Sequence, residues 1–364
     1  MLLSYKVENF ESFKDELEFN MILYRRFIDR FENNIIVDNN LKISRLCAIA
    51  GENGSDKTSF MRSIHFLKHC ILYSNHIVSY KNLLHKYLTD NQHFEIEVLL
   101  GTKIYKYNLE INLIGLIKEK LSVKENKKNH KYEEVFESIL KQCDNYEISV
   151  NSKYINEQLH QIINQGIEHL PGLMVNHLYK LNIHIVKPFI DWLENKLIIE
   201  TPHIASLDFY ESLHANELNL EIMKNESFLE IIQLIDSSII DIEIDDKKPY
   251  QESYIIRDYN DGNKFKIKLK DESSGTREFF TWSVQIWKVI YDNATLFADE
   301  IDKTLNPILI SKIISYIKGS YIYCETKEKY EKHRGQFIFS THNLMALNAA
   351  DYMKEQIYFI TKKR

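Results

Sequence analysis

Glycine and proline are scarce in this sequence, with 10 Gly and 5 Pro among 364 residues. Flexible linkers and low-complexity segments are usually rich in these two residues, so the sequence predicts few of either. Hydrophobic residues make up 44% of the chain and charged residues 27%, which is enough apolar material for a large core. We therefore expect one large domain that carries an insertion, or two lobes.

Cysteine is also rare, and no two cysteines form a Cys-x-x-Cys pair. The four are Cys47, Cys70, Cys143 and Cys324. This spacing argues against a zinc ribbon and against a disulfide framework. His65 and His69 are four residues apart on an expected helix, but no third ligand accompanies them, and we interpret them as structural. The predicted location is a reducing cytoplasm.

No stretch of the sequence approaches the ~18 apolar residues that a membrane-spanning helix needs. Residues 1–9 alternate like a strand and carry Lys6 and Glu8, so they lack the apolar core of a signal peptide. We therefore expect no membrane partner.

A strong positive charge is missing as well, because the formal net charge is -6 and the pI is near 6.2. The chain as a whole lacks the basic field of a protein that coats DNA, so any nucleic-acid contact would be local. The candidate patch consists of Lys124, Lys127, Lys128 and Lys131. Its simplest interpretation is a solvated hairpin tip.

Alternating apolar and polar residues predict two N-terminal strands, residues 2–8 and 17–23, joined by a turn. A continuous apolar run at 46–50 then leads into Gly51, and such a run is typical of a strand buried on both faces. Apolar residues at helical spacing follow and predict a helix over 58–73. Strand, glycine-bearing loop and helix are thus expected in that order.

Further along, the sequence predicts a hairpin over 93–112 and a second one around 126–129. Residues 132–230 are expected to be mainly helical and to form a lobe inserted into the core. The predicted division is therefore an N-terminal part of the core at 1–131, the lobe at 132–230 and a C-terminal part at 231–364. In the last part we expect strands at 239–244, 254–258 and 265–269 and a helix at 276–291.

The segment Gly-Glu-Asn-Gly-Ser-Asp-Lys-Thr, residues 51–58, comes close to the phosphate-loop pattern GxxxxGK[ST]. In such a loop, backbone N–H groups and a helix N-terminus bind phosphates, Lys57 reaches the β and γ phosphates, and Thr58 ligates Mg²⁺. Asp56 stands where the pattern has glycine, and its carboxylate would compete with phosphate at the positive end of the helix. The residues expected to contact nucleotide are Asn53, Gly54, Ser55, Lys57, Thr58 and Ser59.

Two acidic residues, Asp299 and Glu300, end an apolar strand at 294–298. In this arrangement Asp299 would hold Mg²⁺, and Glu300 would orient or deprotonate the attacking water. Ser274 and Gly275 lie at the start of a helix and offer a second phosphate-binding N-terminus. Both features also have an ordinary interpretation, because acidic pairs often end strands and serine or glycine often begins a helix.

A further strand, which begins at Phe337 and is expected to be buried, leads to His342. A lone histidine at a strand end is more often structural than functional. All four features, however, place polar residues at strand ends or helix starts, where α/β folds bind ligands. Chance agreement among four features is improbable, so the sequence predicts one site for ATP and Mg²⁺.

These motifs resemble AAA-type ATP-binding proteins of the ABC/SMC/RecF-like branch, as found in bacterial phage-defence (abortive-infection) operons. The similarity covers YKVENFESFKDELEF, the phosphate loop, FEIEVLLGTKIYKYNLEI, SSGTREFF, FADEIDKTLNP and STHN. From about 132 to 225 it is loose. The resemblance implies an α/β fold: an ABC/SMC-type P-loop ATPase head with a mixed sheet, an antiparallel β subdomain and an inserted, mainly helical lobe.

By this resemblance, Ser274 and Gly275 belong to the ABC signature, Asp302 lies in the D-loop, and His342 is the switch histidine that senses the γ-phosphate. The signature of one subunit closes over ATP held by the other, so the resemblance also implies a homodimer with ATP at its interface.

Two residues depart from the family pattern. Asp56 replaces a glycine, which puts nucleotide affinity in doubt. Asn306 stands where a histidine often precedes the proline, and we expect this change to affect only local packing.

The expected function is slow ATP hydrolysis that opens and closes the dimer and so controls a separately encoded effector, a nuclease or a toxin, in anti-phage defence. Only 22 residues, 343–364, follow His342, which leaves room for a final strand near 356–360. Three alternatives stay open. The protein could be a RecF/SMC-like ATPase acting on DNA, a nucleotide-dead scaffold disabled at Asp56, or an ABC transporter subunit that needs a membrane partner.

Overall fold

The computed structural model describes residues 1–24, 29–52, 54–73, 91–112, 115–140, 146–155, 172–200, 216–258, 263–324, 328–347 and 351–360. These residues form two compact units. The first comprises Met1–Arg26, Ile36–Ser44 and Ser59–Leu197, and the second comprises Phe27–Ile35, Arg45–Thr58 and Ile198–Arg364. Within the described ranges, no helix is long and apolar enough to cross a membrane.

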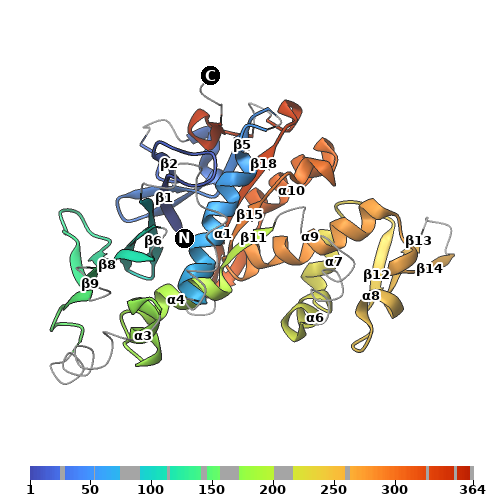
Figure 1. Ribbon diagram of the computed structural model, residues 1–364. Coiled ribbons are helices and arrows are strands. Elements are labelled where there is room, and N and C mark those ends of the chain that lie inside the picture. The colour runs from blue at the N-terminus through green and yellow to red at the C-terminus, as the bar shows by residue number, and fades with distance from the viewer. Residues whose placement is uncertain are drawn as a thin grey trace. The chain divides into compact units, whose positions relative to one another are not determined.

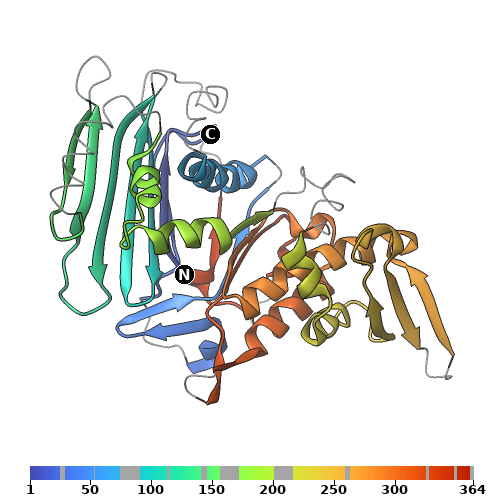
Figure 2. The same cartoon turned by 90° about the horizontal axis from the view of Figure 1, so that it is seen from below.

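An antiparallel sheet of seven strands forms the first unit, in the order β10-β9-β8-β7-β6-β1-β2 (Figures 1 and 2). Its strands are β1 (Leu2–Glu8), β2 (Leu17–Asn20), β6 (Gln92–Leu100), β7 (Lys103–Ile111), β8 (Leu116–Glu125), β9 (Glu133–Leu140) and β10 (Tyr146–Val150). Each strand from β6 to β10 pairs with the next one in the chain, so this part is built from local contacts. The predicted N-terminal strand pair and both predicted hairpins are confirmed.

Where the structure describes the chain, the helices that accompany this sheet are α1 (Lys57–Leu72), α3 (Met174–Lys180) and α4 (Lys187–Asn195). Aromatic side chains join α1 to the sheet, because the ring of Phe60 lies 5.8 Å from Tyr5 and 5.4 Å from Phe19. On α4, the Phe189 ring lies 5.4 Å from Tyr107 of β7. The helix predicted over 58–73 is therefore present, and its apolar face is in the core.

Residues 132–230 differ in part from the expected helical lobe. Its described helices are α3, α4, α6 (Glu217–Met223) and α7 (Glu226–Ile232), but β9 and β10 belong to the seven-stranded sheet and β11 (Leu197–Glu200) to the sheet of the second unit. The helical expectation is wrong for these strands. In β9, Val135 and Phe136 are both buried, while the flanking Glu134 and Glu137 pair with Lys120 of β8, so the strand lacks the simple alternation that would predict it. The extent of a separate lobe stays a proposal.

A five-stranded sheet forms the centre of the second unit, in the order β11-β15-β18-β5-β19. Its other strands are β5 (Leu46–Ala50), β15 (Thr295–Ala298), β18 (Gln336–Thr341) and β19 (Ile357–Phe359). β18 runs parallel to β15 on one side and to β5 on the other, and β19 runs parallel to β5. Every residue of β5, β15 and β18 is buried, as their continuous apolar runs predict.

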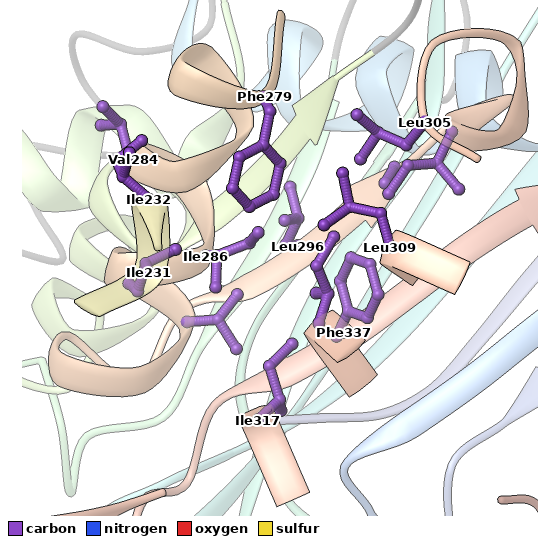
Figure 3. Packing of buried hydrophobic residues seen from close by; sticks show 14 of the residues in the cluster. Ile231, Ile232, Phe279, Val284, Ile286, Leu296, Leu305, Leu309, Ile317 and Phe337 are labelled. Carbon is purple, nitrogen blue, oxygen red and sulfur yellow. The ribbon is translucent and has the colours of Figure 1, made fainter. Parts of the chain in front are cut away.

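Two long helices, α9 (Ser274–Tyr291) and α10 (Pro307–Gly319), pack on this sheet. Figure 3 shows Phe279 and Ile286 of α9 beside Leu296 of β15, with Phe337 of β18 and Leu309 of α10 close by. All five side chains are buried. The core therefore fixes β15 and β18, the strands whose ends carry the predicted acidic pair and the predicted histidine.

A three-stranded antiparallel sheet also belongs to the second unit. It consists of β12 (Ile239–Glu243), β13 (Tyr254–Asp258) and β14 (Lys264–Lys268), with the short helix α8 (Pro249–Glu252) between the first two strands in the chain. The remaining elements are β3 (Ile35–Asp38), β4 (Leu41–Ser44), β16 (Tyr321–Cys324) and β17 (Lys329–Lys332), and the 3-10 turns η1 (Asp29–Asn34), η4 (Leu269–Asp271), η5 (Ile301–Lys303), η7 (Leu344–Ala346) and η8 (Lys354–Gln356). The strands and the helix predicted between 239 and 291 are confirmed.

Candidate functional site

The carboxyl ends of three neighbouring parallel strands carry the predicted polar residues. β5 leads to Gly51, β15 leads to Asp299 and β18 leads to His342. The pairing of Thr341 with Ala50 places the ends of β18 and β5 at the same edge of the sheet. The fold therefore brings together three of the four features that the sequence singles out.

The loop after β5 turns tightly around two glycines. A Cβ atom on Gly51 would lie 2.3 Å from Ser55 Oγ and 2.6 Å from the Ile360 carbonyl oxygen, so no side chain fits there. Gly54 has a φ of +76°, in the left-handed region that glycine occupies without strain. Asn53, another residue predicted to contact nucleotide, lies outside the described residues.

Asp56 also has a left-handed backbone, with a φ of +70°. The phosphate-loop pattern has glycine here, and the backbone conformation gives the reason, because a residue without Cβ adopts it freely. Aspartate and asparagine are the other residues that tolerate this region best. The loop thus keeps its shape with aspartate in place, and α1 begins at the next residue.

The ammonium group of Lys57 is surrounded by acceptors. These are Gly51 O at 2.8 Å, Glu52 O at 2.9 Å, Ser55 Oγ at 3.3 Å and His342 Nδ1 at 2.9 Å. Burial lowers the pKa of Lys57, and nearby carboxylates, led by Glu300, oppose that effect. The backbone oxygens therefore hold the cation in the loop where a phosphate would lie.

His342 links this lysine to the acidic pair. Its Nδ1 accepts a hydrogen bond from Lys57 Nζ, because an ammonium group can only donate. The neutral ring then carries its hydrogen on Nε2 and donates it to Glu300 Oε1 at 2.9 Å. Lys57, His342 and Glu300 therefore form one chain of hydrogen bonds.

Glu300 combines an unusual backbone with a well-bonded carboxylate. Its φ is +47°, a conformation that is strained for a residue with a side chain and is often found at functional sites. Burial raises the pKa of Glu300, but the bonds to His342 and Lys303 outweigh burial and hold the pKa below its usual value. Glu300 is therefore ionised at neutral pH, the state that a general base needs.

Asp299 is fully buried at the end of β15. Its Oδ1 accepts a hydrogen bond from Ser340 Oγ at 2.5 Å, whereas its Oδ2 is buried and has no hydrogen-bond partner among the described residues. Burial raises the pKa of Asp299, and the hydroxyl groups of Ser340 and Thr58 oppose it. A buried carboxylate oxygen without a partner fits a bound cation.

The available oxygens fit Mg²⁺ that arrives with a nucleotide. Mg²⁺ usually takes one or two protein oxygens and completes its shell with phosphate oxygens and water. The Thr58 hydroxyl and the Asp299 carboxylate, which interact with each other, are such a pair. Across the described ranges no group of three or more His, Cys, Asp or Glu could hold a metal alone.

Two residues of this site escaped the sequence analysis in part or entirely. Asp302, placed in the D-loop by resemblance, uses its Oδ2 to accept hydrogen bonds from Thr341 Oγ1 at 2.7 Å and from His342 N at 2.8 Å. Asp302 therefore holds the backbone at His342. No role was predicted for Ser340. The signal that could have indicated one is its position, one residue before the end of a buried strand.

Ser274 and Gly275 begin α9, next to the three-stranded sheet (Figure 1). The preceding Ser273 caps this helix, since its Oγ accepts a hydrogen bond from Thr276 N at 3.2 Å. Within the described part of the chain, no hydrogen bond or ion pair joins Ser274 or Gly275 to Lys57, Asp299 or Glu300. Their signature role stays a prediction, as does nucleotide contact by Ser59, which is buried in α1.

A phosphate loop between a buried strand and a helix, an acidic pair after a second parallel strand and a histidine after a third define a P-loop ATPase fold. The chain belongs to the family described as AAA domain, putative AbiEii toxin, Type IV TA system, which it matches over residues 46–348.

Solved structures with a similar fold were also found. The SMC head domain from Thermotoga maritima is 13% identical, with 98% of this chain and 94% of that chain covered and a TM-score of 0.46. The recombination mediator protein RecF in the RecFOR pathway, in a structure titled RecF-ATP, is 14% identical, with 94% and 91% covered and a TM-score of 0.35. A search of curated proteins found no match. These identities and scores are too low to transfer a function.

Proposed function

We propose that this protein binds ATP with Mg²⁺, hydrolyses it slowly, and uses ATP to join two copies of the chain into a homodimer. The observation that supports this best is the hydrogen-bond chain from Lys57 through His342 to Glu300. It connects the residue that would hold the β and γ phosphates to the residue that would activate water. A γ-phosphate at Lys57 would thus be sensed directly by the catalytic carboxylate.

Each residue has a role in this mechanism. Lys57 exchanges the carbonyl oxygens that it contacts for phosphate oxygens. The phosphate loop, in which Gly54 and Asp56 have left-handed backbones, directs backbone N–H groups to the same phosphates. Glu300 accepts a proton from the attacking water, and the Nε2–H of His342 holds its carboxylate in place. Thr58 and Asp299 would hold Mg²⁺, which would supply positive charge to neutralise the transferred phosphoryl group.

Release of phosphate from ATP by the purified chain, with and without Mg²⁺, tests the proposed activity. We expect slow release that requires Mg²⁺. No binding and no release at millimolar ATP would contradict the proposal and favour the nucleotide-dead scaffold, whereas hydrolysis that depends on DNA would favour a DNA-repair ATPase.

Ser274 supports the homodimer, since it is exposed at the start of α9 and makes no hydrogen bond to the described residues of the phosphate loop of its own chain. We expect Ser274→Arg to lower ATP hydrolysis about a hundredfold, which is ~2.7 kcal/mol, because a bulky cation blocks closure by a second copy. Nucleotide binding to the single chain should stay within twofold of native. Ser237→Arg, an exposed serine elsewhere in the same unit, is the control. Equal loss of binding and hydrolysis would show that the signature assignment is mistaken.

Asp56 is expected to weaken ATP binding without abolishing it. Two charges ~4 Å apart interact by about 1 kcal/mol in water and ~4 kcal/mol near a protein surface, which corresponds to roughly one to three decades in affinity. Asp56→Gly removes both the charge and the backbone strain, and Asp56→Asn removes only the charge. Calorimetric titration of ATP and Mg²⁺ should therefore show tighter binding by both variants. Native affinity in both variants would mean that the carboxylate does not face the phosphates.

The useful output of this switch would be control of a separately encoded effector, a nuclease or a toxin, in anti-phage defence. The family description, which names a putative AbiEii toxin and a type IV toxin–antitoxin system, supports a protein that acts together with a second gene product. Copurification of this chain with the product of the neighbouring reading frame, with and without ATP, tests this part of the proposal. Equal copurification with and without ATP would argue against a switch.

A further inference from the structure

Ser340 lies one residue before the end of β18, and its hydroxyl contacts both acidic residues that follow β15. Its Oγ lies 2.5 Å from Asp299 Oδ1 and 2.7 Å from the backbone nitrogen of Glu300. A hydroxyl has one hydrogen, and a backbone N–H can only donate. Ser340 therefore donates to Asp299 and accepts from Glu300, and it is fully buried while it does so.

The bond to Asp299 decides which of its oxygens stays available. Ser340 occupies Oδ1, and Oδ2 stays buried without a hydrogen-bond partner among the residues that the structure describes. Fixing one oxygen also fixes the plane of the carboxylate, so the other oxygen points in a defined direction. Partners of this kind behind a metal ligand commonly tune the affinity for the metal.

The bond from Glu300 acts on the backbone. Glu300 occupies the left-handed region, and its N–H donates to Ser340 Oγ, which holds the peptide in this orientation. The same turn leads the Glu300 carboxylate to His342 Nε2. Ser340 and His342 therefore both contact Glu300, the first at its backbone nitrogen and the second at its carboxylate.

We propose that Ser340 is a positioning residue that sets the affinity of the site for Mg²⁺ through Asp299 and the rate of ATP hydrolysis through Glu300. This role rests on the proposed function, because it belongs to the same ATP site. Ser340 acts only through its two neighbours. Loss of its hydroxyl should therefore weaken metal binding but leave metal-free nucleotide binding, which depends on Lys57 and the loop, unchanged.

The test measures metal and nucleotide separately on the full chain. Mn²⁺ serves as the probe, with free Mn²⁺ read by electron paramagnetic resonance in the presence of a non-hydrolysable ATP analogue. A fluorescent ATP analogue in EDTA reports metal-free nucleotide binding. Ser340→Ala removes the hydroxyl, Ser340→Cys keeps the size but donates only weakly, and Ser340→Thr keeps the hydroxyl. Ser283→Ala is the control, since Ser283 is also buried and, among the residues with described positions, its hydroxyl bonds only to the Phe279 carbonyl oxygen of its own helix.

We expect Ser340→Ala and Ser340→Cys to weaken Mn²⁺ binding about tenfold or more and to lower kcat, with metal-free nucleotide affinity unchanged. Ser340→Thr and Ser283→Ala should stay near native. Native Mn²⁺ affinity in Ser340→Cys, with a melting temperature like that of Ser283→Ala, would overturn the role of Ser340 alone. Absence of nucleotide binding by the native chain would instead contradict the proposed function.

Discussion

Replacing Glu300 by glutamine is expected to stop ATP turnover while ATP binding persists. Glutamine keeps the size of the side chain but cannot accept a proton from water, and loss of a general base typically costs about 10²- to 10⁴-fold in rate. Lys57 and the phosphate loop are untouched, so ATP should stay bound and the dimer should accumulate. Phosphate release and light scattering, each with ATP and Mg²⁺, measure the two effects.

Glu221→Gln is the matched control for this substitution, since Glu221 is exposed in α6 of the same unit. It should hydrolyse ATP at the native rate. If Glu300→Gln has the same mass with and without ATP, then ATP does not hold two chains together. If it hydrolyses ATP at the native rate, Glu300 is not the base.

Removing the ammonium group at position 57 should abolish nucleotide binding. A cation and a phosphate ~4 Å apart interact by about 4 kcal/mol near a protein surface, so Lys57→Ala should weaken ATP binding by roughly three decades. Hydrolysis should be lost with binding, in contrast to Glu300→Gln. Titration with a fluorescent ATP analogue measures the change.

The control for Lys57→Ala is Lys318→Ala, which removes a lysine paired with Asp351 in the same unit. Its ATP affinity should be native. Both proteins need their melting temperatures recorded, because Lys57 also bonds to two carbonyl oxygens of the loop. A folded Lys57→Ala protein that binds ATP within tenfold of native would show that this loop does not hold phosphate.

Local pattern was sufficient to predict most strands and helices of the second unit. The runs 46–50 and 337–339 are each continuous and apolar, and both lie in strands that are buried at every residue. The hairpin around 126–129 was predicted, but the residues of its second strand, β9, were assigned to the helical stretch, because glutamates flank its buried positions and their pairing with Lys120 of β8 becomes visible only once the strands are aligned. Charge pairing between strands therefore cannot be recognised from the sequence of one strand alone.

The site itself was predictable only as separate pieces. The hydrogen bond between Lys57 and His342 joins residues 285 positions apart and depends on β18 lying between β5 and β15. Nothing in a local pattern fixes that strand order. Asp56 shows a second limit of prediction from sequence. The sequence indicates only that its carboxylate would repel phosphate, whereas its φ of +70° shows that the position also requires a residue that tolerates a left-handed backbone.

The strand order of the central sheet also has a consequence for how the chain folds during synthesis. β5 pairs with β18 and β19, and Leu46 lies opposite Phe337, which is 291 residues later. At about 5–20 residues per second, a ribosome needs roughly 15–60 s to supply that partner. The hairpins from β6 to β10 can form early, since each strand pairs with the next, but β5 waits with both edges open. The phosphate loop is therefore made long before its partner strand β18 and becomes functional only after β18 arrives, so chaperone dependence in this protein should concentrate on β5.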